Sequence, residues 1–448
     1  MSQNEYASLV AKVWNYAHVL RDQGISYGDY VEQITYLLFL KMDEERSELL
    51  GEPSAVPPQW RWNQLNSKDG DALELQYRHT LENLAIQDGL MGIIFRKAQN
   101  KLTDPAKLKR VVSLIDSEGP WIGIGVDVKG QIYEGLLERN AAEVKSGAGQ
   151  YFTPRPVIEA IVACVQPQVG ETVCDPACGT GGFLLAAYDY MKGQSQDRER
   201  LRKLRHESFT GVDLVDEVVR LCAMNLYLHG IGNGGSPVRQ GDSLAADPGE
   251  RYHVVLTNPP FGKKSSYRVV GEDGDVTTER ENYERDDFKF TTSNKQFNFL
   301  QHIMTILEQD GRAGVVLPDN VLFEAGRSGE GIRKRLLEQF DFHTLLRLPT
   351  GIWYSPGVKA NVLFFDKKPA AREPWTNALW IYDFRTNVHF TLKTNPLKSN
   401  DLDDFVQCYR PGGPAARRHR RARRAPLPWG RMVGAGAHQA PSGRGRAT

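Results

Sequence analysis

The chain has 448 residues, of which 40% are hydrophobic and 25% are charged, and its formal net charge is +1. This is the composition of a globular protein with room for two or three domains. No apolar run approaches the roughly 20 residues that cross a bilayer, and the first residues lack the basic and apolar regions of a signal peptide. Together with five cysteines, an odd number, these features predict a cytoplasmic protein without a membrane partner.

Residues 1–125 are predicted to form an all-α N-terminal domain. Apolar residues recur at helical spacing after polar or acidic starts in the segments 30–42, 73–86, 89–102 and 104–115. No catalytic constellation occurs in this region. One interpretation is a plain structural bundle, and the other is a clamp on nucleic acid or a docking surface for a partner.

Residues 126–410 are predicted to form an α/β catalytic domain. Strands and helices alternate from about residue 146 to about residue 370, which is the pattern of a doubly wound, Rossmann-like parallel sheet. Seven strands are expected, at residues 171–174, 209–212, 237–240, 253–257, 312–317, 344–348 and 361–366. Cys174 and Cys178 stand too far from other Cys and His residues for a zinc site, and we expect them to be small buried side chains.

A glycine-rich turn follows the first expected strand. The run 173–184 predicts a short strand, a turn at 179–182 and then an apolar helix. Such glycines let the backbone approach a ligand closely, and the missing Lys-Ser/Thr excludes a phosphate-binding P-loop. Asp175 at the strand end suits the ammonium of a methionine-derived cofactor better than a pyrophosphate. The carboxylate of such a cofactor could use the N–H groups of the turn and the helix start.

Two further acids stand where the second and third strands should end. Asp213 closes the segment 209–213, and an acid at that place accepts hydrogen bonds from ribose hydroxyls in nucleoside-binding α/β folds. Asp242 lies sixteen residues before Asn258. Each acid taken alone also fits a helix cap or a turn. In series with the glycine-rich turn, the two acids favour a nucleoside-containing cofactor.

The tetrapeptide Asn258-Pro259-Pro260-Phe261 ends the fourth expected strand. Its prolines fix the backbone and remove two N–H donors, so that free carbonyls lie beside the Asn amide oxygen and an aromatic ring. Two acceptors and a ring suit a planar amine, whose N–H bonds and face they can bind. The structural alternative is a proline-stiffened turn with a capping Asn.

A long insertion, residues 263–294, follows this turn directly. It is polar, highly charged and without periodicity. Insertions of this length are usually functional or disordered. We expect a mobile lid over the target base, in preference to a disordered segment.

Residues 411–448 differ in composition from the rest of the chain. They contain nine arginines, no lysine and no acidic residue amid Pro, Gly and Ala, so the net charge of +1 becomes −8 over residues 1–410. A segment of this kind is not expected to fold. It is interpreted either as a nucleic-acid-binding tail or, preferably, as an out-of-frame terminus.

The segments 175–183 and 258–261 together resemble the S-adenosylmethionine-dependent adenine methyltransferases that methylate amino groups. The chain is also similar to the modification (M) subunit of type I restriction–modification systems in the segments 13–21, 30–41, 149–155 and 311–318. This resemblance runs from about residue 5 to about residue 410. It implies a seven-stranded methyltransferase sheet whose last strand is antiparallel.

The resemblance also implies roles for individual residues. It assigns catalysis to Asn258, Pro259, Pro260 and Phe261, and it implies no metal. It assigns S-adenosyl-L-methionine binding to Gln150, Tyr151, Phe152, Thr153, Pro154, Arg155, Asp175, Gly179, Thr180, Gly181, Gly182, Asp213 and Asp242. Of these, residues 150–155 would cover the methionine end, Asp213 would hold the ribose and Asp242 would lie near the cofactor's adenine. Relatives often have Glu in place of Asp213, so the carboxylate is kept but its reach is shorter.

The implied reaction is methyl transfer to the exocyclic amino group at position 6 of adenine in DNA. The Asn258 side-chain oxygen and the Pro259 carbonyl would accept the amine N–H bonds, and Phe261 would stack on a base flipped out of the duplex. Residues 1–410 are net acidic, which argues against strong DNA binding by this chain alone. The resemblance accordingly implies assembly of two M subunits with one specificity (S) subunit, to which a restriction (R) subunit can add.

Three alternatives remain at this point. The chain could be a stand-alone adenine methyltransferase, or it could methylate a protein glutamine, whose side-chain amide is another planar amine. The N-terminal helical domain and Phe261 count against a protein substrate. The third alternative, suggested by the unusual tail, is a truncated assembly remnant that binds cofactor but does not dock.

Overall fold

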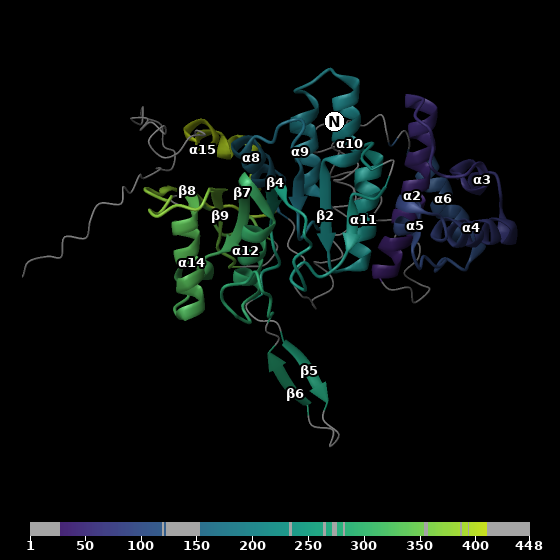
Figure 1. Cartoon of the computed structure of the whole chain (residues 1–448). Helices are drawn as coiled ribbons and strands as arrows, with labels where there is room; N and C mark the ends of the chain where they lie inside the picture. Colours follow the sequence, from purple (N-terminus) through teal and green to yellow (C-terminus); the bar gives the residue numbers. More distant parts are fainter. Residues whose placement is uncertain are drawn as a thin grey trace, which may run out of the picture.

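The computed structural model describes residues 27–118, 121, 153–232, 235–262, 266–270, 276–280, 283–353, 357–385, 388–392 and 394–409. It has an α/β body with an all-α domain at the N-terminal side (Figure 1). Several predictions fall outside the described residues, namely the segment 13–21, Gln150, Tyr151, Phe152 and the tail 411–448. No described helix is both long and apolar enough to cross a membrane.

The N-terminal domain is helical, as predicted. Its elements are α2 (Tyr27–Leu50), η2 (Pro58–Trp60), α3 (Trp62–Asn66), α4 (Gly70–Ala85), α5 (Gly89–Phe95) and α6 (Pro105–Ser117). The Asp104 side chain caps α6 by accepting hydrogen bonds from two backbone N–H groups of its first turn. The helix α5 ends at Phe95, earlier than the predicted residue 102, because the backbone leaves the helical region at Arg96 and Lys97 has a φ of 59°.

The catalytic body is built on one eight-stranded sheet. Its spatial order is β10-β8-β9-β7-β4-β1-β2-β3. The strands are β1 (Val173–Asp175), β2 (Phe209–Asp213), β3 (Val238–Gln240), β4 (Tyr252–Thr257), β7 (Leu307–Pro318), β8 (Phe340–Arg347), β9 (Ala360–Lys367) and β10 (Trp380–Asp383). All seven predicted strands are present, and the last of them, β9, runs antiparallel to both of its neighbours. The count of seven was wrong by one, because β10 adds an eighth strand parallel to β8.

Helices cover both faces of this sheet. On one face lie α8 (Arg155–Val165), α9 (Gly182–Lys192), α11 (Asp216–Leu228) and α15 (Asp403–Cys408), which share one apolar core with the strands. On the other face, α12 (Lys295–Ile306) and α14 (Arg327–Gln339) share a second core with β4, β7, β8 and β9. The helix α10 (Arg198–Glu207) accounts for the long spacing between Asp175 and Asp213.

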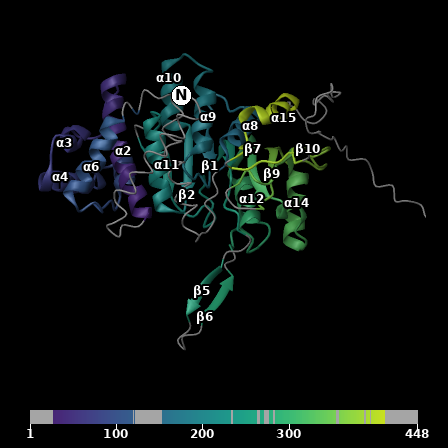
Figure 2. The ribbon, with the colours of Figure 1, turned by 180° about the vertical axis from the view of Figure 1, so that it is seen from behind.

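The insertion after the catalytic turn has more regular structure than predicted. The segments β5 (Ser266–Val270) and β6 (Val276–Arg280) pair antiparallel as a two-stranded sheet of their own. This hairpin extends away from the body of the molecule in both views (Figures 1 and 2). From Tyr283 onward the insertion packs back on the body, where Phe288, Leu244 and Phe299 form a small apolar cluster.

Candidate active site

The predicted cofactor acids and the catalytic turn meet at one edge of the sheet. The strands β3, β2, β1 and β4 are consecutive and parallel, so their carboxyl ends lie side by side. Asp175 ends β1, Asp213 ends β2 and Asn258 directly follows β4. The sequence therefore placed these three side chains correctly relative to their strands, and the strand order brings them together.

The glycine-rich turn is anchored on the neighbouring strand. The N–H group of Gly179 donates to Asp213 Oδ2 at 3.1 Å, and the N–H group of Cys178 donates to the Val212 carbonyl at 3.0 Å. Gly179 has a φ of +53°, and a Cβ placed on it would meet nothing within 4 Å. Gly181 has a φ of +86°. These positive φ values favour glycine, and the open space above Gly179 is room for a ligand.

Asp175 has a buried carboxyl group, and its surroundings disfavour the charged form. Its side chain is 1% exposed and accepts a hydrogen bond from the Ala177 N–H at 3.1 Å. Burial, together with the nearby Asp213, raises the pKa of Asp175 to about 7. No cationic side chain among the described residues forms an ion pair with it. A ligand ammonium at this place would stabilise the carboxylate, which fits a methionine-derived cofactor.

Asp213 combines a structural role with spare acceptor capacity. Its Oδ2 accepts from the Gly179 N–H and its Oδ1 accepts from the Val215 N–H at 3.0 Å. Burial raises the pKa of its carboxyl. Since a carboxylate offers about four acceptor sites, two hydrogen bonds leave room for ribose hydroxyls. The side chain thus orients the glycine-rich turn, and its binding of a sugar remains a prediction.

The loop after β3 is clamped from two sides. Asp242 accepts hydrogen bonds from the Leu244 N–H at 2.9 Å and from the Tyr283 hydroxyl at 3.2 Å. The Ser243 hydroxyl donates to the Pro176 carbonyl at 2.6 Å, which ties this loop to the end of β1. The buried Arg285 donates to the Ser243 carbonyl at 3.1 Å. The end of the charged insertion therefore holds the loop of Asp242, the third predicted cofactor acid, and its sequence did not reveal this contact.

The catalytic turn presents a buried acceptor without a donor. Asn258 Nδ2 donates to Thr153 Oγ1 at 2.8 Å, so that the amide oxygen is directed away from Thr153. Within the described part of the chain, Asn258 Oδ1 is buried and has no hydrogen-bond partner. Gln296, itself 1% exposed, donates to the Gly262 carbonyl at 2.6 Å and so holds the end of the turn. A buried acceptor of this kind requires a functional explanation.

An aromatic pair lines the same turn. The ring of Phe261 lies 5.7 Å from the ring of Trp353, centroid to centroid, in an edge-to-face arrangement. Trp353 is 2% exposed, and its Nε1 has no hydrogen-bond partner among the residues that the structure describes. Trp353 was missed by the sequence analysis. Its position depends on a contact between the loop after β8 and the turn after β4, which no local sequence pattern predicts.

The remaining predicted cofactor residues precede or begin α8. Thr153 contacts the catalytic turn as described above, and Pro154 occupies the N-cap position of α8. The guanidinium of Arg155 lies 3.6 Å from Glu159 and 3.9 Å from Asp189, so it links α8 to α9. Cofactor contacts of Thr153, Pro154 and Arg155 remain predictions.

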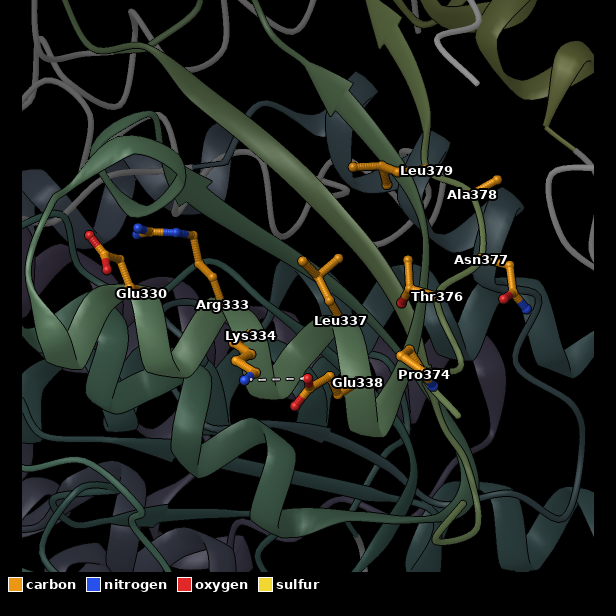
Figure 3. Close-up of a pocket in the computed structure, with 10 residues that line it drawn as sticks. All are labelled: Glu330, Arg333, Lys334, Leu337, Glu338, Pro374, Thr376, Asn377, Ala378 and Leu379. Atoms are coloured by element: carbon orange, nitrogen blue, oxygen red, sulfur yellow. Dashed lines mark ion pairs between the residues drawn. The ribbon is translucent and has the colours of Figure 1, made fainter. Parts of the chain in front are cut away.

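A separate cavity lies away from all of these residues. It has a volume of about 550 Å³ between α14 and the segment that leads into β10. Figure 3 shows its lining, including the ion pair of Lys334 with Glu338 at 3.7 Å. No predicted catalytic or cofactor residue contributes to it. The candidate site is therefore defined by the strand ends, and this cavity is distinct from it.

The fold and the site define the chain as an S-adenosylmethionine-dependent methyltransferase of the Rossmann-like class. The family model for N-6 DNA methylases matches residues 125–420, and the model for the HsdM N-terminal domain matches residues 9–115. The chain belongs to the N-6 DNA methylase family, as one of the methylase subunits of type I restriction enzymes. The methyl donor is S-adenosylmethionine and the activity is that of an adenine-specific DNA methyltransferase, as predicted.

Curated relatives and a solved structure support this assignment. The EcoKI methylase subunit of Escherichia coli (strain K12) is 41% identical over 90% of this chain and 76% of its own length. The StySJI methylase subunit of Salmonella typhimurium (strain LT2) is also 41% identical, with the same coverage. A solved structure from Vibrio vulnificus YJ016, described as a type I modification subunit, is 27% identical with a TM-score of 0.73. It covers 90% of this chain, which covers 89% of that structure.

Proposed function

We propose that Asn258 and Pro259 bind the amino group of the target adenine through its two N–H bonds. The observation that carries this proposal is that Asn258 Oδ1 is buried and has no hydrogen-bond partner in the described part of the chain. Because the Asn258 amide nitrogen donates to Thr153 Oγ1, the amide oxygen points away from that contact. The Pro259 carbonyl, in a residue without an N–H group, supplies the second acceptor.

These two acceptors also give the amine its reactivity. Its nitrogen lone pair is delocalised into the adenine ring, and two hydrogen bonds in the plane of the amide and carbonyl oxygens draw the nitrogen toward tetrahedral geometry. No strong base is required before attack, because the amine proton can leave afterwards. Preorganised acceptors of this kind act without reorganisation at the moment of reaction.

The cofactor is proposed to lie over the ends of β1, β2 and β3. Asp175 would bind its ammonium, Asp213 its ribose hydroxyls, and the open space above Gly179 would admit its chain. Asp242 would lie near its adenine. When bound, the sulfonium supplies the electrophilic methyl group. The protein contributes the orientation of the amine and the exclusion of water.

Phe261 and Trp353 are proposed to form the aromatic wall of the target-base pocket. Stacking of a base on an aromatic ring contributes about 1–3 kcal/mol. This gain helps to offset the few kcal/mol that extrusion of a base from the duplex costs. The buried Nε1 of Trp353 provides an additional donor at this wall.

The chain is proposed to act on DNA as part of a larger assembly in the cytoplasm, where its substrate lies. We propose two copies with one S subunit, and an R subunit that adds to them. The support is the 41% identity to type I methylase subunits and the net charge of −8 over residues 1–410. An acidic chain gains little from phosphate contacts, which suits delegation of DNA recognition to a partner.

Product identification tests the proposed function. The chain is co-expressed with its specificity subunit and incubated with methyl-labelled S-adenosylmethionine and either duplex DNA or ribosomal release factors. We expect label in 6-methyladenine of DNA, in wild type and not in an Asn258→Ala variant. Label in protein glutamine would contradict the proposal, and label in neither substrate would support the inactive-remnant alternative.

A further inference from the structure

The helix α11 belongs to both hydrophobic cores of the protein. On one side, Ala223, Met224, Tyr227 and Leu228 are part of the core of the N-terminal domain. On the other side, Val219, Cys222 and Leu226 are part of the core of the catalytic sheet. Figure 1 shows α11 beside α2 and α5 of the N-terminal domain. A displacement of the N-terminal domain therefore acts on a helix that also packs in the catalytic body.

Buried polar contacts fix α11 to the N-terminal domain. Arg220, 7% exposed, donates to the Tyr36 hydroxyl and to the Arg96 carbonyl, both at 3.0 Å. It also forms an ion pair with Glu32 at 2.7 Å. Since removal of one partner from a buried charged network is costly, these contacts hold the start of α11 firmly in the N-terminal domain.

Tyr227 makes a second set of contacts, about two turns further along the helix. Its hydroxyl donates to Asp43 Oδ1 at 2.6 Å and accepts from the Ala55 N–H at 2.9 Å. The guanidinium of Arg46 lies 4.3 Å from the centroid of its ring and donates to its backbone carbonyl at 2.6 Å. All of these partners are residues of the N-terminal domain.

The opposite side of α11 contacts the glycine-rich turn. Asn225 is completely buried, and its Nδ2 donates to the Thr180 carbonyl at 3.0 Å. The Asn225 Oδ1 has no hydrogen-bond partner among the described residues, so Nδ2 is the one side-chain atom of Asn225 with a described contact. Cys222 and Leu226 lie under Gly181, where an added Cβ would be 2.8 Å from Cys222 Sγ.

Thr180 and Gly181 lie immediately before α9, so their peptide units set the direction of the first N–H groups of that helix. Within the described residues, no side chain caps this helix start. We propose that Asn225 is a positioning residue, which aims the backbone of the glycine-rich turn at the cofactor. Through α11, cofactor affinity then depends on the packing of the N-terminal domain. This inference rests on the cofactor site proposed above.

The test measures S-adenosylmethionine affinity by calorimetric titration of the full-length chain, together with Tm. Asn225→Leu keeps the size of the side chain and removes the donor, and Asn225→Asp replaces the donor by an acceptor facing the Thr180 carbonyl. We expect binding at least tenfold weaker in both variants. Tyr227→Phe removes one hydroxyl that touches only the N-terminal domain, and we expect binding at least threefold weaker.

Two variants serve as references. Asp213→Ala, in the proposed ribose contact, is expected to weaken binding at least fivefold. Asn63→Ala, at an exposed position of α3, is expected to change neither affinity nor Tm. Titrations are run well below the lowest Tm, so that a loss of stability alone leaves the dissociation constant of the folded protein unchanged.

The outcomes separate the two proposals. If wild type fails to bind, or Asp213→Ala binds as wild type does, the proposed cofactor site is wrong. If Asp213→Ala weakens binding but the Asn225 and Tyr227 variants lower Tm with affinity within twofold of wild type, α11 is only a structural support and the inference is overturned. Should the Asn225 variants fail to fold, Tyr227→Phe decides the question alone.

Discussion

Individual residues of the site are held in states that cost stability. The buried carboxyl of Asp175 lies at one edge of the sheet with two buried atoms, Asn258 Oδ1 and Trp353 Nε1, that have no hydrogen-bond partner among the described residues. A buried polar group without a partner costs about 1–3 kcal/mol. Such groups are rare in folded proteins. Their concentration beside the glycine-rich turn and the catalytic turn is explained if cofactor and adenine complete their hydrogen bonds.

Asp175 predicts the pH dependence of cofactor binding. Its pKa of about 7 means that the free protein is half protonated near neutral pH, while an ammonium ligand requires the carboxylate. S-adenosylmethionine affinity should therefore rise up to tenfold per pH unit below 7. It should then level off and decline as the ligand amine, of ordinary pKa near 8, loses its proton. Calorimetry from pH 5.5 to 8.5 checks this, with Asp175→Asn expected to bind weakly at every pH.

The raised pKa of Asp175 also predicts that Asp175→Asn, a variant expected to bind cofactor weakly, is more stable than the wild type at high pH. The folded-state pKa of Asp175 lies above its ordinary value, so the folded protein binds a proton that the unfolded chain has lost between about pH 4 and pH 7. Stability falls as pH rises through this window, by at most about 4 kcal/mol. Asp175→Asn should thus raise Tm of the cofactor-free protein at pH 8 and have little effect near pH 4. An unchanged or lower Tm at pH 8 would argue against a buried, strained carboxylate.

At the level of secondary-structure elements, apolar patterning in the sequence predicted the strands that are held together mainly by burial of their own side chains. Six of the seven predicted strands have dense apolar runs and are buried between helices, whereas β3 at the edge of the sheet has two exposed residues. The eighth, β10, has only four residues and follows a loop without a helix, so it has little periodicity of its own and forms because β8 offers a free edge. The hairpin of β5 and β6 was missed because its strands pair only with each other, in a sheet separate from the main one.

The site was predictable to the extent that its chemistry is contiguous in the sequence. The local sequences of the glycine-rich turn and of the segment 258–261 are enough to predict the kind of ligand that each would bind. The contact of Thr153 with Asn258 spans 105 positions, and the contact of Asn225 with Thr180 spans 45. Trp353 likewise reaches Phe261 from a different strand end. Such contacts arise from strand order and helix packing, which a single sequence does not disclose.

The hairpin provides a test at this scale. Its strands belong to a sheet separate from the main one, so replacement of residues 266–280 by a short Gly-Ser linker should leave Tm and S-adenosylmethionine affinity unchanged. If the insertion is a lid over the target base, methylation of DNA by the complex should fall. Melting curves, calorimetry and a methylation assay compare the two forms. Unchanged methylation would exclude the lid, and lost cofactor binding would make the hairpin part of the cofactor site.

At the scale of the whole molecule, the N-terminal domain and the catalytic domain share the helix α11, which contributes residues to both cores. The division at about residue 125 remains a prediction, and it coincides with the gap between the two matched family models. The core of the N-terminal domain nevertheless includes residues of α11, far beyond that point. The N-terminal domain is thereby placed to influence the cofactor site without contributing a catalytic residue.

The Arg-rich segment 411–448 predicts a whole-chain effect on DNA binding. Its composition buries too little apolar surface to offset the entropy of ordering, so its deletion should leave Tm and cofactor affinity unchanged. Its nine arginines should give weak, sequence-independent DNA binding that is lost as salt rises, because counterion release drives such binding. Gel shifts across a salt series check this. Loss of a tight complex with the specificity subunit on deletion would instead show a genuine assembly element.

The central claim is that the Asn258 side-chain oxygen binds the target amine and not the cofactor. The most direct test measures turnover and S-adenosylmethionine affinity of Asn258→Ala side by side, in the complex with the specificity subunit, with Asn63→Ala as the control. The account predicts that methylation of adenine falls by at least a hundredfold, while cofactor affinity stays within about threefold of wild type. Retained turnover, or a parallel loss of cofactor binding, would contradict it.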